Sequence, residues 1–124
     1  NIPLVTTWSG IDSITHDAKN YIGSIGVYGS RSANFVIQNS DFVLSLGSRL
    51  DTRVTGGVPK NFAREAIIAS VDIDKNELNK NRGLKINIKV SIRRKQWKVV
   101  LISLSLKHQI LLRNMPVSCV IITE

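Results

Sequence analysis

The sequence predicts an α/β fold, in which an open parallel sheet carries helices on its faces. Apolar runs alternate with helical patterns along about the first 90 of its 124 residues, as in sheets built from strand, helix and strand crossovers. Two of these runs, residues 41–46 and 66–71, are almost continuously apolar. Such runs are typical of strands that are buried on both faces of a parallel sheet.

The first strand is expected at residues 2–6, where the sequence is aliphatic and β-branched (IPLVT). Pro3 restricts this strand to a start position or a sheet edge, because proline has no N–H to give to a ladder. Residues 7–29 carry several glycines and no sustained period, and therefore predict mostly loop.

A helix is expected from about residue 31 to residue 39, with Ser30 as its N-cap. Its apolar face has the spacing i, i+3 and i+4. The residues on that face are Ala33, Val36 and Ile37.

The second strand, residues 41–46, is followed by a long polar loop at residues 47–61. Residues 66–71 predict a third strand, and residues 75–81 predict a short helix with Asp74 as N-cap. Residues 85–90 alternate polar and apolar side chains, which predicts a half-exposed or edge strand.

Ligands of open parallel sheets bind beyond the carboxyl ends of the strands. The segments that follow the first three strands begin at Thr7, Gly47 and Asp72. All three are therefore expected at one edge of the sheet, where a ligand would bind.

Residues 47–57 (GSRLDTRVTGG) carry most of the candidate chemistry. Gly47 lets the backbone approach a ligand closely, and Ser48 offers a hydroxyl. Two arginines can donate paired hydrogen bonds to a phosphate or carboxylate. These arginines are Arg49 and Arg53, and Asp51 between them could orient one. The alternative is an ordinary loop with solvated Arg–Asp pairs, each worth about 0 to 1 kcal/mol.

Asp72 is placed like the acid that binds a ribose hydroxyl in nucleotide-binding sheets, whereas Asp74 is better explained as a helix cap. No dinucleotide or P-loop fingerprint occurs. His16 and His108 have no further ligands at metal-binding spacing, and no nucleophile motif is present. We therefore expect no metal site and no catalytic residue in this chain.

The formal charge of +8 is unevenly distributed. Residues 1–84 hold nine Lys or Arg and eight Asp or Glu, whereas residues 85–124 hold eight bases and one acid. One basic cluster surrounds an aromatic residue, as in single-strand binders, so a nucleic-acid-binding module is an alternative function. The cluster consists of Arg93, Arg94, Lys95, Trp97 and Lys98.

The single cysteine, Cys119, cannot form an internal disulfide, which favours a reducing, cytoplasmic compartment. No apolar run approaches the roughly 20 residues of a membrane span, so we expect no membrane partner and no signal peptide.

Five motifs, in order and at suitable distances, resemble the central domain of thiamine-diphosphate-dependent enzymes of the acetolactate synthase type. They are IPLVTT at residues 2–7, HD at 16–17, GSIGVYGSRSAN at 23–34, SDFVLSLGSRLDTRVTG at 40–56 and IASVDID at 68–74. The resemblance covers about residues 1–90. Residues 91–124 form a basic tail that does not resemble the family. We interpret this tail as an out-of-frame product or a diverged remnant.

The resemblance implies a Rossmann-like domain that binds FAD, ADP or no ligand, depending on the member of the family. The implied cofactor-binding residues are Thr7, Trp8, Tyr28, Gly47, Ser48, Arg49, Asp51, Arg53, Asp72 and Ile73. Two of them depart from the family pattern. Tyr28 stands where acetolactate synthases usually have histidine, and Trp8 replaces an aliphatic residue.

The resemblance also implies partners. The family domain opens with a further strand and a glycine-bearing turn, and we expect this first βα unit to be missing before Asn1. Thiamine diphosphate and magnesium would bind to other domains of an intact parent enzyme, which is expected to be a homo-oligomer. The chain alone is therefore expected not to catalyse the decarboxylation and carboligation of 2-keto acids.

Three functions are compatible with these patterns. The favoured one is a central-domain fragment with a nucleotide-binding or structural role. The others are the basic nucleic-acid-binding module and a fragment that binds no ligand and is stable only within a larger assembly.

Overall fold

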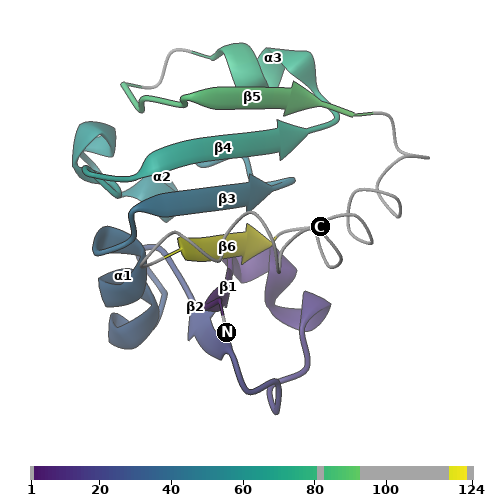
Figure 1. The fold of residues 1–124 in the computed structure, drawn as a ribbon, viewed down its shortest axis with the longest axis vertical. Helices are drawn as coiled ribbons and strands as arrows, with labels where there is room; N and C mark the ends of the chain where they lie inside the picture. The colour runs from purple at the N-terminus through teal and green to yellow at the C-terminus, as the bar shows by residue number, and fades with distance from the viewer. Residues whose placement is uncertain (1, 81–82, 93–117, 123–124) are drawn as a thin grey trace.

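The computed structural model describes residues 2–80, 83–92 and 118–122. Six strands in these residues form one parallel sheet in the order β2-β1-β6-β3-β4-β5 (Figure 1). They are β1 Leu4–Thr6, β2 Tyr21–Ser24, β3 Phe42–Leu46, β4 Ile67–Asp72, β5 Ile88–Ser91 and β6 Ser118–Ile122. The predicted fold class, an open parallel sheet with flanking helices, is confirmed.

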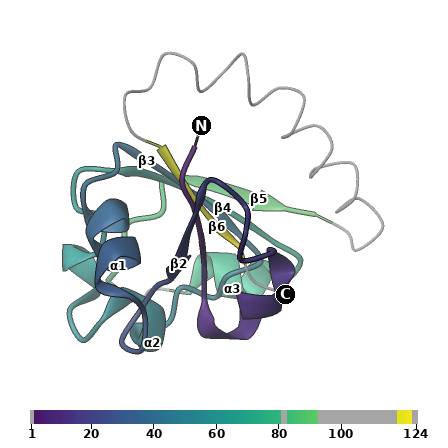
Figure 2. The ribbon, with the colours of Figure 1, turned by 90° about the horizontal axis from the view of Figure 1, so that it is seen from below.

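Short helices connect the strands. They are η1 Trp8–Ser13, α1 Arg31–Gln38, α2 Thr52–Thr55, η2 Pro59–Asn61 and α3 Lys75–Asn79, where η marks a 3-10 helix. Helices α1 and α2 lie on the same side of the sheet (Figure 2). This is the arrangement that right-handed crossovers produce when successive connections advance across the sheet in one direction.

Side-chain caps determine where the α-helices begin. The Ser30 hydroxyl accepts a hydrogen bond from the Ala33 N–H at 3.1 Å, and the Asp74 carboxylate accepts one from the Asn76 N–H at 2.8 Å. Each cap satisfies an N–H that has no partner within its own helix. Both predicted N-caps, those of α1 and α3, are confirmed.

The sheet separates two apolar clusters, because alternate residues of a strand point to opposite faces. In β3, Val43 belongs to the first cluster and Leu44 to the second; in β4, Ile68 and Ala69 divide in the same way. The first cluster includes Ala33 and Ile37 of α1. The remaining buried members of the first cluster are Val5, Ile25, Leu50, Phe62 and Ala63, and those of the second are Leu46, Val71 and Ile92.

The prediction of loop for most of residues 7–29 overlooks two short elements, η1 and β2. Strand β2 is short, pairs with β1 alone, and contains Gly23 at φ +131°. An edge strand of this kind has no continuous apolar run to reveal it. Pro3 lies directly before β1, at the strand start that proline tolerates.

The second predicted loop, residues 47–61, contains α2 and η2. Strand β5 lies at the sheet edge, as its alternating pattern predicts, although it begins at Ile88 instead of residue 85. In residues 91–124 the sequence patterns predict no element, whereas β6 lies between β1 and β3. No helix within the described ranges has the length and apolar character needed to cross a membrane.

Candidate functional site

A cavity of about 400 Å³ lies at the carboxyl ends of β1 and β3, where the sequence predicts the ligand. Its lining comes from the segment after β1, the loop between β2 and α1, and residues 47–54. The lining residues are Thr7, Trp8, Ser9, Ile25, Tyr28, Gly47, Ser48, Arg49, Leu50, Asp51, Arg53 and Val54. Eight of the ten predicted site residues are thus brought together.

Thr7, directly after β1, is a buried polar residue that lines the cavity. Its side chain is 3% exposed, and its hydroxyl has no hydrogen-bond partner among the described residues. A buried hydroxyl without a partner costs about 1 to 3 kcal/mol.

Two aromatic rings stand at the mouth of the cavity. Trp8 and Tyr28 are 70% and 76% exposed, and their ring centroids lie 6.3 Å apart at an interplanar angle of 64°. Exposed aromatic rings at a cavity mouth offer a surface on which a planar ligand group can stack.

The segment after β3 turns sharply into the cavity. Gly47 has φ +68°, a backbone conformation that favours glycine, and its N–H donates to the Val71 carbonyl at 2.8 Å. The buried Ser48 hydroxyl accepts a hydrogen bond from the Leu50 N–H at 3.3 Å. Leu50 also has a positive φ, +46°, although its side chain is buried. A non-glycine residue in this conformation is uncommon and is often found at binding sites.

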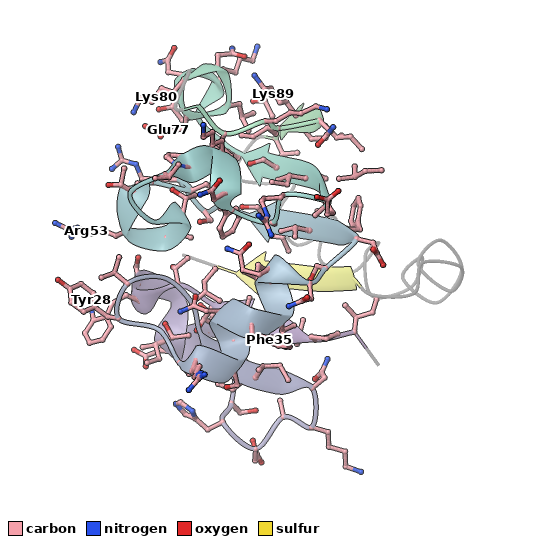
Figure 3. All side chains as sticks on the ribbon, turned by 90° about the vertical axis from the view of Figure 1, so that its left-hand side faces the viewer. Tyr28, Phe35, Arg53, Glu77, Lys80 and Lys89 are labelled. Atoms are coloured by element: carbon pink, nitrogen blue, oxygen red, sulfur yellow. The ribbon has the colours of Figure 1, made fainter. Side chains whose placement is uncertain are left out.

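The two predicted arginines lie at the rim of the cavity and differ in their partners. Arg49 Nη2 lies 3.2 Å from Glu77 Oε1 of α3, and its side chain is 67% exposed. Glu77 also pairs with Lys80. The exposed Arg53 side chain forms no salt bridge within the described residues, and Figure 3 shows it at the same side of the molecule as Tyr28.

Asp51 caps a helix and does not orient an arginine side chain, which is the role that the sequence suggested. Its carboxylate accepts hydrogen bonds from the backbone N–H groups of Arg53 and Val54, at 3.0 and 3.3 Å, and caps α2. It therefore positions the backbone of Arg53 and does not bridge to a guanidinium in the described structure.

The apolar floor of the cavity is not predicted from the sequence. Ile25, Leu50 and Val54 line it and join the first apolar cluster. Their sequence signal is weak, because each is a single aliphatic residue within a polar or glycine-rich segment. Only the approach of two loops makes them neighbours.

Asp72 and Ile73 do not line the cavity. Asp72 is 7% exposed, and its carboxylate accepts a hydrogen bond from the Asp74 N–H at 2.9 Å. This turn explains the place of Asp72 as the last residue of β4. A ribose-binding role for Asp72 stays a prediction.

No cluster of three or more His, Cys, Asp or Glu residues in the described part of the chain could hold a metal ion. His16 instead packs edge-on against Tyr21, with ring centroids 5.6 Å apart. His108 and the basic cluster at residues 93–98 lie outside the described residues.

Together, these side chains suit a ligand that has both an anionic part and an apolar or planar part. The guanidinium groups at the rim attract an anion, and the floor accepts an apolar or planar group. The volume falls within the range of about 300 to 1,000 Å³ typical of small-molecule sites.

Comparison with known proteins gives a consistent result. Residues 1–97 match the family model described as the central domain of thiamine pyrophosphate enzymes. A probable acetolactate synthase 2 (chloroplastic) from Oryza sativa subsp. japonica is 41% identical over 87 residues, which are 70% of this chain and 13% of that protein. The acetolactate synthase isozyme 2 large subunit of Escherichia coli (strain K12) is 37% identical over 81 residues, 65% of this chain and 15% of that protein.

A probable acetolactate synthase large subunit from Methanococcus aeolicus is 37% identical over 92 residues, 74% of this chain. The chain spans about 13 to 15% of the length of these relatives. Neither the family model nor these relatives support a nucleic-acid-binding function. Since the family model covers more than half of the chain, the chain belongs to the family of thiamine pyrophosphate enzyme central domains.

Proposed function

We propose that the cavity binds the diphosphate-bearing part of an adenine nucleotide cofactor, either FAD or ADP. In this proposal the chain is the nucleotide-binding central part of an acetolactate synthase-like enzyme and is not catalytic alone. The observation that carries the proposal is a cavity at the carboxyl ends of β1 and β3 that is lined by two arginines and by two exposed aromatic rings.

The residues at the cavity divide the expected contacts among three parts of the ligand. Arg53 and Arg49 are suited to the diphosphate, because a guanidinium donates two parallel hydrogen bonds to phosphate oxygens. Trp8 and Tyr28 are suited to a planar ring at the mouth, and Ser48, which also lines the cavity, to a ribose or ribityl oxygen. The ligand would extend beyond the cavity, which opens at the rim.

The reaction itself belongs, in this proposal, to the intact parent enzyme. Thiamine diphosphate, held with magnesium by other domains, supplies the electron sink for decarboxylation of a 2-keto acid. The described residues contribute binding and assembly. The relatives that carry the name acetolactate synthase are the reason for this choice of reaction class.

Calorimetric titration of the full chain with ADP and with FAD tests the proposal, with magnesium thiamine diphosphate as the comparison ligand. We expect ADP or FAD to bind and to raise the melting temperature, and thiamine diphosphate to do neither. Arg53→Ala is expected to weaken binding about tenfold or more, because a hydrogen bond to a charged group contributes about 1.5 to 3 kcal/mol.

Arg31→Ala is the matched control, since it removes an exposed arginine of α1 that does not line the cavity. The control should bind like the unaltered chain. Absence of binding by both ADP and FAD would refute nucleotide binding and favour the purely structural role. Equal weakening by the two substitutions would show that the arginines act only through net charge.

A further inference from the structure

One side chain of α1 holds the turn between β2 and α1, residues 25–30. Asn34 Oδ1 accepts a hydrogen bond from the Gly26 N–H, and Asn34 Nδ2 donates one to the Gly26 carbonyl, each at 2.9 Å. A backbone N–H can only donate and a backbone carbonyl can only accept, so the amide group fits in one orientation. Ala33 and Ile37 of the same helix, 0% and 1% exposed, pack into the first apolar cluster. The turn is thus attached to a firmly packed helix.

Gly26 lies among residues that line the cavity. Ile25, directly before it, belongs to the cavity floor, and Tyr28, two residues after it, stands at the mouth. Between them, the Val27 N–H donates to the Arg53 carbonyl at 2.8 Å and joins the turn to α2. Tyr28 and Arg53 lie on the same side of the molecule (Figure 3). Floor, mouth and rim therefore meet at the backbone that the amide holds.

The hydrogen bonds within the turn fix its shape but not its position. The Gly29 N–H donates to the Gly26 carbonyl at 3.0 Å, and the Ser30 N–H donates to the Ser24 carbonyl at 2.8 Å. Both bonds join residues of the same turn, so they move with it. The Asn34 amide instead joins the turn to the middle of α1. We therefore expect the turn to keep its shape but to shift when this amide is removed.

We propose that Asn34 is a positioning residue of the cavity, whose amide sets the place of the aromatic mouth relative to Arg53. The proposal rests on the nucleotide binding proposed above and adds to it a residue that does not line the cavity. Asparagine suits this task, because its amide presents an acceptor and a donor side by side, as the Gly26 backbone requires. Alanine offers neither group, and a binding site whose parts are less firmly placed loses affinity.

Calorimetric titration of the full chain with ADP tests the proposal in two variants of the same helix. Asn34→Ala is expected to weaken ADP binding about tenfold, because the ring at the mouth and the guanidinium at the rim lose their fixed positions. Asn39→Ala is the matched control, since it also removes an amide that donates to a backbone carbonyl, that of Phe35 at 2.8 Å, at the far end of α1. The control should bind ADP within about twofold of the unaltered chain.

A third variant separates positioning from a general loss of stability. Ile37→Val destabilises α1 by removing a buried methylene, but it leaves the contact between Asn34 and Gly26 in place. At a temperature where every variant is folded, Ile37→Val should bind ADP as the unaltered chain does. Equal weakening by Ile37→Val and Asn34→Ala would overturn the positioning role.

A double-mutant cycle shows whether Asn34 acts through Arg53. In an Arg53→Ala background the guanidinium is already lost, so Asn34→Ala should weaken ADP binding only about threefold or less. The remaining effect would come from the ring at the mouth. The same tenfold weakening in both backgrounds would overturn the coupling to Arg53.

A measurement without ligand keeps this proposal distinct from the proposed function. Amide hydrogen exchange followed by NMR should be about tenfold faster or more at Gly26 and Val27 in Asn34→Ala than in Asn39→Ala, because the acceptors of these two N–H groups are lost or displaced. If neither ADP nor FAD binds but exchange rises in this way, the proposed ligand is wrong and the positioning of the turn by Asn34 stands. Unchanged exchange at both amides would overturn the positioning role, whichever ligand binds.

Discussion

Gly26 shows how a single residue holds the cavity together. It has φ +99°, and an added Cβ would lie 2.4 Å from the Arg53 carbonyl oxygen. Its N–H and carbonyl both bond to the Asn34 side-chain amide, each at 2.9 Å, and the next residue, Val27, donates to the Arg53 carbonyl at 2.8 Å. The loop that carries Tyr28 is thereby held against the helix that carries Arg53.

Gly26→Ala is expected to destabilise the protein by about 2 kcal/mol or more, from the unfavourable φ and the clash with backbone. Gly57→Ala is the control, because an added Cβ there meets nothing within 4 Å. It should change the free energy of unfolding by no more than about 0.5 kcal/mol. Chemical denaturation measures both values, and equal values would contradict the close approach.

At the scale of elements, helix α2 depends on one carboxylate. Only four residues long, it begins at the Asp51 cap, and the Thr55 hydroxyl also donates to the Asp51 carbonyl at 2.9 Å. The cap adds to the contacts that Val54 makes with the first apolar cluster and to the hydrogen bond from Val27 to Arg53. Its position determines where Arg53 meets a ligand.

Asp51→Ala should therefore lower the free energy of unfolding by about 1 kcal/mol, whereas Asp51→Asn, which retains a capping oxygen, should leave it nearly unchanged. Denaturant titration measures the two changes. If Asp51 acted through its charge on an arginine, the asparagine variant would instead bind ADP as poorly as the alanine variant does.

The elements that the sequence predicts well are those with local signals. Continuous apolar runs identify β3 and β4, and Ser30 and Asp74 mark two helix starts. Strand β2 was missed because an edge strand with a glycine has no such run. Strand β6 was missed because its place depends on pairing with distant strands, which no local pattern encodes.

The residues of the candidate site likewise divide into those that local sequence signals predict and those that only the fold brings together. Strand ends and the arginine-bearing segment predict six of the residues that line the cavity, and the family resemblance adds Trp8 and Tyr28. Asp72 instead accepts a hydrogen bond from the Asp74 N–H within its own turn. The floor residues Ile25 and Val54 depend on two loops meeting at Gly26, a contact that is not visible in either loop alone.

At the scale of the whole molecule, the sheet separates two cores that have no buried residue in common among those described. Ile37 packs in the first and Val71 in the second. Distant sites without common partners contribute to stability almost additively. The two faces are therefore expected to respond independently to mutation.

A double-mutant cycle tests this independence. Ile37→Val is expected to cost about 0.5 to 1.5 kcal/mol and Val71→Ala about 2 kcal/mol, with a coupling energy below about 0.5 kcal/mol. The control cycle pairs Ile37→Val with Val43→Ala inside the first cluster, where a larger coupling is expected. Comparable coupling in both cycles would show that the two cores behave as one.

The position of β6 also has a consequence for the order of folding. Val5 pairs with Ile121, so the ladder between β1 and β6 joins two segments that lie far apart along the chain. Contacts between such distant segments slow folding, since a long loop must close before they form. During synthesis, the ladders that β6 makes with β1 and β3 can therefore form only after residues 118–122 have left the ribosome.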